Sequence, residues 1–173
     1  MSAPMTAAQL LLECLRTALL ARPAPPPENK IMLRAGQEVT PLLGKNTDEC
    51  CTGLAWVRVV GVRANDRYAD RAGIGTCFTH TRTATLEMGV VRCAPSATVN
   101  GVPTADQWTA AALQVDSDYE AMEAALCCAY GDLNDLGDDV PIIDQYEPLG
   151  VDGNCIGGIM TVEVDLSCGC AST

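Results

Sequence analysis

The chain has little of the residue that most enzymes use as a general base, because His80 is its single histidine. A nucleophile in a hydrolase is usually activated by a neighbouring histidine. Cys77 precedes His80 by three residues, but close sequence neighbours seldom form a catalytic pair. The G-x-S-x-G, H-E-x-x-H and Walker motifs are also absent. We therefore expect a protein that is not an enzyme, with no catalytic, cofactor-binding or metal-binding residues.

Long apolar runs and a basic start are missing as well. No stretch approaches the ~20 apolar residues that a membrane helix needs, and the N-terminus lacks the basic region of a signal peptide. These two absences predict a chain that is made in the cytoplasm and does not enter a membrane.

Positive charge is missing from the second half of the chain. All 11 Lys and Arg lie at or before Arg92, together with 8 acids, whereas 14 acids and no Lys, Arg or His follow Cys93. The net charge of -11 argues against a protein that reads nucleic-acid sequence. The acidic half either keeps the protein soluble or acts on a partner through its electrostatic field, and both interpretations stay open.

The ten cysteines do not follow the spacing of a structural zinc site. No C-x-x-C occurs; Cys50-Cys51 and Cys127-Cys128 are adjacent pairs, and Cys168 and Cys170 flank one glycine. One hypothesis is buried reduced thiols that act as small apolar side chains. The other is disulfides that form once the protein leaves a reducing cytoplasm. In either case we expect at least one member of each adjacent pair to be buried.

The acidic tract from Asp132 to Asp139 contains Asp132, Asn134 and Gly137, as a calcium loop would. Counting from Asp132 places Leu136 at the fifth position and Ile143 at the twelfth, so two ligands of such a loop are missing. A solvated acidic loop is the simpler interpretation, and loose calcium binding is the alternative.

The strongest local pattern runs from Thr81 to Tyr130. Apolar residues alternate from Arg82 to Arg92, which predicts a strand with Thr83, Thr85 and Glu87 on its polar face. Thr104 and Gln107 form a capping-box pair ahead of a helix, for which Gly131 is a plausible stop. The apolar stripe of this helix comprises Trp108, Ala111, Ala112, Val115, Tyr119, Met122 and Leu126. Its polar side comprises Asp106, Asp116, Asp118, Glu120 and Glu123.

The remaining segments complete a single domain over residues 1–173. Residues 1–22 form an amphipathic helix with a Thr6–Gln9 capping box, and 23–29 form a stiff Pro-rich connector. Residues 30–173 hold the sheet and the long helix. The expected strands are 31–35, an interior strand 54–63 anchored in the core by Trp56, the strand 82–92, one near 141–148, and a closing strand 159–166. The fold class is therefore α+β, a mainly antiparallel sheet in the order α-β-β-β-α-β-β with helices on one or both faces.

Several ordered segments resemble the tail terminator or head-to-tail connector proteins of tailed phages that infect actinobacteria. The segments are Leu33-Arg34-Ala35-Gly36-Gln37-Glu38-Val39, Cys50 to Val59, Leu86 to Pro95, Ala125-Leu126-Cys127-Cys128, Pro148-Leu149-Gly150 and Gly153 to Gly158. The acidic tract and the Cys168–Cys170 tail are not part of the resemblance.

The resemblance implies a structural virion protein, made in the host cytoplasm, that forms a ring of six copies at the head-proximal end of the tail. Its expected partners are further copies of itself, the tail tube protein, the head-tail connector proteins, and genomic DNA that passes through the channel without being read. Alternatives are a stopper or head-completion ring or, less in keeping with the sequence, a small metal-binding or Cys-dependent enzyme based on Cys77, His80 or the acidic tract.

The charge division leads to one further expectation. The acidic half should present a wide negative surface, because so many charges cannot be buried. In a ring this surface would face either the DNA channel or a basic partner ring. Five arginines would then lie nearer the lateral or opposite axial contacts: Arg58, Arg63, Arg67, Arg71 and Arg82.

Overall fold

The computed structural model describes residues 1–35, 50–64, 82–97, 101–137, 141–152 and 154–166 of the chain. The elements are α1 (Ala3–Leu20), a 3-10 turn η1 (Glu28–Lys30), β1 (Ile31–Arg34), β2 (Leu54–Ala64), β3 (Arg82–Cys93), α2 (Ala105–Asn134), β4 (Ile142–Asp152) and β5 (Cys155–Leu166). Apart from η1, their order is the predicted α-β-β-β-α-β-β, and the α+β fold class is confirmed.

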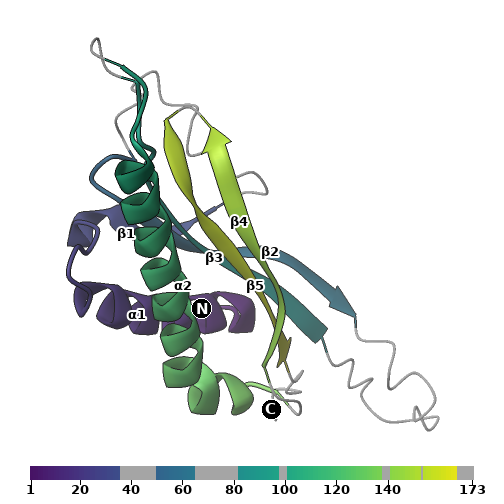
Figure 1. Cartoon of the computed structure of the whole chain (residues 1–173). Helices are drawn as coiled ribbons and strands as arrows, with labels where there is room; N and C mark the ends of the chain where they lie inside the picture. Colours follow the sequence, from purple (N-terminus) through teal and green to yellow (C-terminus); the bar gives the residue numbers. More distant parts are fainter. Residues whose placement is uncertain (36–49, 65–81, 98–100, 138–140, 153, 167–173) are drawn as a thin grey trace, which may run out of the picture.

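The five strands form one sheet in the order β1-β2-β3-β5-β4 (Figure 1). The pairs β2–β3, β3–β5 and β4–β5 are antiparallel, whereas β1 runs parallel to β2. The prediction of a mainly antiparallel sheet is confirmed, and the interior position predicted for residues 54–63 is confirmed as well. β1 and β4 are the two outer strands of this sheet.

Both helices pack on the same face of the sheet, which we call the helix face (Figure 1). Alternate residues of β3 and β5, such as Leu86, Met88 and Val162, point toward this face and are fully buried. They meet the buried stripe of α1, which includes Leu11, Leu15 and Leu19. The burial of these apolar side chains is the main driving force for the fold.

The helix α1 begins earlier than the predicted capping box. Its N-cap is Ser2, and Pro4 lies in the first turn, where a missing N–H costs nothing. Thr6 is therefore already inside the helix, and its hydroxyl donates to the Ser2 carbonyl at 3.3 Å. The Thr6–Gln9 capping box is a wrong prediction, although the helix itself is confirmed.

The helix α2 has the predicted capping box, in which the Thr104 hydroxyl accepts from Gln107 N and the Gln107 side chain accepts from Thr104 N. It continues past Gly131 to Asn134, so the predicted stop is wrong. Its first turns also depart from the predicted stripe, because Trp108 is 41% exposed and Ala112 is exposed as well. Continuous burial begins only in the second half of the helix, which contains Met122 and Leu126.

A second, smaller cluster lies on the sheet face opposite the helices, which we call the opposite face. It joins Cys50, Leu54, Trp56, Val91 and Cys155. Trp56 is fully buried, as predicted, and its indole lies flat over Gly89, the residue paired with it on β3. A Cβ added at Gly89 would stand 2.4 Å from the indole ring, so glycine is what admits the tryptophan.

None of the helices in the described residues is long and apolar enough to span a membrane.

Candidate functional site

The residues considered for catalysis are not placed by the structure. Cys77 and His80 fall in 65–81, outside the described residues. Asp132 and Asp135 are exposed near the end of α2, while Asp138 and Asp139 also lie outside the described part of the chain. Within the described ranges, no group of three or more His, Cys, Asp or Glu side chains could hold a metal ion. The structure does bring together several cysteines and two buried ion pairs. It also leaves two outer strands at the edges of the sheet.

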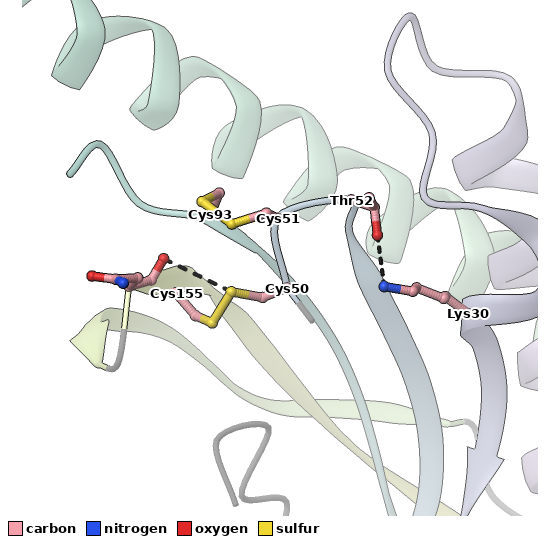
Figure 2. The surroundings of a disulfide bond; sticks show 7 residues. Lys30, Cys50, Cys51, Thr52, Cys93 and Cys155 are labelled. Carbon is pink, nitrogen blue, oxygen red and sulfur yellow. Dashed lines mark hydrogen bonds between the residues drawn. A yellow bond between two sulfur atoms is a disulfide. The ribbon is translucent and has the colours of Figure 1, made fainter. Parts of the chain in front are cut away.

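Four cysteines meet at one end of the sheet (Figure 2). Cys93 at the end of β3 and Cys155 at the start of β5 are directly paired across the two strands. The adjacent residues Cys50 and Cys51, which precede β2, bond to them as Cys50–Cys155 and Cys51–Cys93. The two disulfides thus tie the entry to β2 to the ends of two other strands.

A third disulfide, Cys14–Cys128, joins the two helices across a sequence separation of 114 residues. For these six cysteines the disulfide hypothesis is confirmed and the hypothesis of buried reduced thiols is wrong. Cys50 is buried, as expected for the first adjacent pair, but Cys127 and Cys128 are both exposed, against the expectation for the second. Cys127 is a free, exposed thiol.

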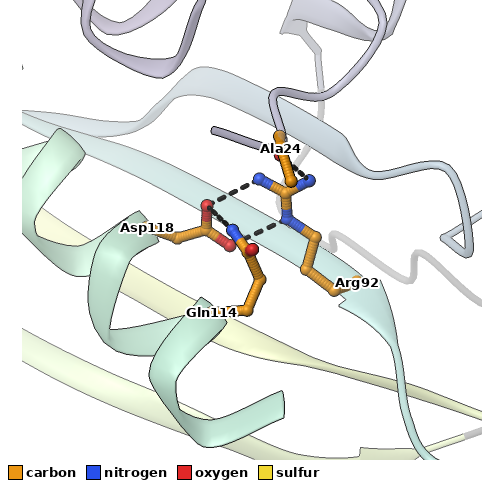
Figure 3. Close-up of polar contacts among 4 residues, drawn as sticks. All are labelled: Ala24, Arg92, Gln114 and Asp118. Atoms are coloured by element: carbon orange, nitrogen blue, oxygen red, sulfur yellow. Dashed lines mark hydrogen bonds and ion pairs between the residues drawn. The ribbon is translucent and has the colours of Figure 1, made fainter. Parts of the chain in front are cut away.

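A buried ion pair anchors the middle of α2 to β3 (Figure 3). Arg92 donates to both Asp118 oxygens, with Nε 2.9 Å from Oδ2 and Nη2 2.6 Å from Oδ1. The Arg92 Nη1 also donates to the Ala24 carbonyl at 2.8 Å, which ties the Pro-rich connector to the same group. Asp118 is only 1% exposed, so its prediction as part of the polar helix side is wrong. A planar guanidinium matches a carboxylate in this two-bond geometry.

The opposite face holds a second buried pair. Glu87 accepts from Arg58 Nε at 2.8 Å and from the Trp56 indole at 2.9 Å, and Arg58 Nη2 is 2.5 Å from its other oxygen. Glu87 and Thr83 are both buried, so the face of β3 that the alternation predicted to be polar and wet is dry at these positions. Arg58 is buried in this pair, and the expectation that it lies near a subunit contact stays a prediction.

The other expected arginines have different outcomes. Arg63 is exposed and pairs with Glu163, with 2.5 Å between Nη2 and Oε1, and Arg82 is exposed. Arg67 and Arg71 lie outside the described residues. The hypothesis that these arginines lie near subunit contacts therefore stays a prediction.

Two tyrosines lie between α2 and β4. The rings of Tyr119 and Tyr146 have centroids 4.5 Å apart. The hydroxyl of Tyr119 donates to Glu123, and this bond raises the pKa of Tyr119 above its ordinary value of 10.0. Burial, with the nearby Asp118 and Asp116 charges, raises the pKa of Tyr146 in the same direction. Both phenols are therefore neutral at physiological pH, and this contact carries no charge.

The sequence contains signals for the pair of Arg92 and Asp118. Arg92 continues the inward alternation of Leu86, Met88 and Val90, and Asp118 lies one helical turn before the inward Met122. A base and an acid at inward positions of two elements predict a buried pair once the elements are known to meet. Sequence patterns alone do not say that they meet.

No known protein-family model matches the chain, and no curated protein matches it.

Proposed function

We propose that this chain is a structural virion protein of a tailed phage: the tail terminator, a ring that caps the head-proximal end of the tail tube and joins the tail to the head. The observation that carries the proposal is the division of charge between the two halves of the chain, which leaves exposed acids on α2 and β4. The exposed acids of α2 and β4 belong to a half of the chain that contains no Lys or Arg, whereas α1 and β1 belong to the half that contains them all. The ordered segments that resemble terminator and connector proteins support the same proposal.

An acidic surface suits a channel for DNA. Nonspecific binding of a protein to DNA comes mainly from attraction between its Lys and Arg side chains and the DNA phosphates. A wall that carries Asp116, Glu120 and Glu123, with Arg22 paired to Glu120, has a net negative charge and repels phosphates, so DNA slides past without being held. The same surface would also fit a basic ring stacked above or below.

A ring explains how one small domain completes a tube. In a closed ring the same two patches repeat around the axis, and each copy uses both. We propose six copies, with the tail tube protein on one side, the head-tail connector proteins on the other, and genomic DNA passing through. The protein is then made in the host cytoplasm and resides in the virion.

Tube assembly in vitro tests this function. Added to growing tubes of the purified tail tube protein, the full-length chain should stop elongation at one end and appear there as a ring by electron microscopy. In intact particles, an antibody label should mark several copies at the head-proximal end of the tail. A single copy there, or none, contradicts the proposal. A label on tail-free heads but not on isolated tails would favour a stopper or head-completion ring instead.

A further inference from the structure

The two outer strands of the sheet carry opposite charges. β1 with the residue before it, Lys30 to Arg34, contains two bases and no acid. β4 contains Asp144, Glu147 and Asp152 and no base. Because the strand order is β1-β2-β3-β5-β4, these strands lie at opposite edges of one molecule (Figure 1).

At the β1 edge, the guanidinium of Arg34 is oriented by the sheet. Arg34 pairs with Arg58 and Met32 pairs with Trp56, so both side chains lie on the opposite face. The Arg34 Cζ atom is 6.0 Å from the centroid of the Trp56 ring, within the range of a cation–π contact. Trp56 is fully buried, so this edge presents a cation on a rigid support beside a half-buried methionine.

At the β4 edge, apolar and acidic side chains are exposed together. Ile142 is 54% exposed and Ile143 42%, which is unusual for two adjacent isoleucines in a folded monomer. Glu147 is also exposed, and its pairing with Ile159 places it on the opposite face. Pro148 and two register shifts interrupt the strand, so a long backbone ladder cannot form here and side chains must make the contact.

We propose that the β4 edge of one copy docks against the β1 edge of the next copy, with Glu147 meeting Arg34. Arg34 and Glu147 lie on the same face at opposite edges. They therefore meet when neighbouring sheets lie side by side with the same face toward the axis. One copy carries both halves of the contact, so the partner is a second copy of this chain. Such a head-to-tail contact closes into a ring or continues as a filament; only the closure rests on the proposed function.

Charge reversal tests the contact, with oligomeric mass measured by sedimentation velocity on the oxidised, full-length chain. The variants Arg34→Glu and Glu147→Arg should each lower the association constant at least about tenfold, because like charges then meet at every joint. A mixture of the two variants should associate within about threefold of the wild type, since every joint then pairs an acid with a base. This recovery is specific to a head-to-tail contact of these two edges.

The matched control is Asp132→Arg, which reverses an exposed acid of α2, outside both outer strands, and should leave association unchanged. Near-ultraviolet circular dichroism confirms that each variant is folded. The proposal is overturned if the single variants associate like the wild type, if the folded mixture stays monomeric, or if the wild type is monomeric up to about 1 mM. If the protein associates through these edges but does not cap tail tubes, the contact stands and the terminator function is refuted. If Glu147→Arg forms rings that cap tubes as well as the wild type does, the terminator function stands and the contact is refuted.

Discussion

At the scale of single residues, the stability of this fold depends on a few buried groups that have no substitute. Asp118 and Arg92 satisfy each other inside the protein, and the carbonyl of Ala24 takes part in the same cluster. Removing one member of a buried pair leaves an uncompensated charge, which costs far more than the pair itself contributes. Glycine at position 89 is equally constrained, because the Trp56 ring occupies the space of a side chain there.

Replacing Asp118 by Ala should lower the free energy of unfolding by about 3–5 kcal/mol, because Arg92 would remain buried without its partner. Urea unfolding followed by circular dichroism measures the change. Asp116→Ala is the matched control on the same helix, and its exposed position predicts a change within about 0.5 kcal/mol. Equal effects of the two variants would show that the Arg92–Asp118 pair does not stabilise the protein.

Replacing Gly89 by Ala should destabilise the protein by about 1–3 kcal/mol, since the new methyl group must displace the Trp56 indole. The control is Gly61→Ala on β2, where no atom lies within 4 Å of the added Cβ. The fluorescence of Trp56 should change only in the first variant, and measuring it in a Trp108→Phe background removes the other tryptophan. A harmless Gly89→Ala substitution would contradict the position of the indole.

At the scale of elements, α2 has two different halves. Its C-terminal half packs on the sheet and is bound to α1 by Cys14–Cys128, and Arg22 near the end of α1 reaches Glu120 at 2.7 Å. Its first turns, which include Trp108 and Leu113, contribute little to the core. The helix is thus a rigid part of the domain that also presents an exposed segment.

Removing the helix–helix disulfide with Cys14→Ser and Cys128→Ser should cost about 2–5 kcal/mol, because the disulfide closes a long loop in the unfolded chain. Thermal unfolding of the oxidised protein measures the loss. Cys127→Ser is the neighbouring control and should have no effect, while wild-type Cys127 should react with iodoacetamide without denaturant. Peptide mapping without reductant should recover 14–128, 50–155 and 51–93; other pairings would contradict the structure.

At the scale of the whole molecule, the exposed acids of α2 and the opposite charges of the two outer strands are the features that a ring would use. The acids on the outer side of α2 would face a channel or a basic partner ring, whereas the charges of β1 and β4 would meet between copies. These two uses involve different residues and respond differently to salt.

Replacing Asp116, Glu120 and Glu123 by amides separates the two roles of the α2 acids. If they line a channel, the amides should tighten the ring at low salt, and the difference from the wild type should vanish near 1 M salt, where the Debye length is about 3 Å. If they bind a basic partner ring, the amides should weaken that joint and high salt should weaken the wild-type joint as well. Sedimentation and partner binding across a salt series measure both. Unchanged assembly, partner binding and DNA delivery at every salt concentration would mean that this surface only maintains solubility.

Because Glu120 pairs with Arg22 and Glu123 accepts from Tyr119, Asp116→Asn alone is the cleanest single variant.

Much of the fold could be predicted because it follows from short-range spacing. Alternation identified β3 and most of β5, and the Thr104–Gln107 pair located the start of α2 to the residue. The errors have local reasons too. The helix α1 begins at Ala3, with Pro4 in its first turn, before the predicted Thr6 capping box, and Gly131 is tolerated inside α2 because its position is exposed. The candidate surfaces were predictable only as an acidic and a basic half, not as sheet edges.

The sequence by itself determined the order of the elements, the periodicity of each one and the division of charge, because all three depend on residues close together in the chain. Only the tertiary structure decided which cysteines pair, that Asp118 turns inward to Arg92, that Glu87 is buried beneath Trp56 and Arg58, and that β1 runs parallel to β2 at an edge. These contacts join residues from 24 to 114 positions apart. Local patterns contain no information on such pairings, which are selected by the packing of the whole core.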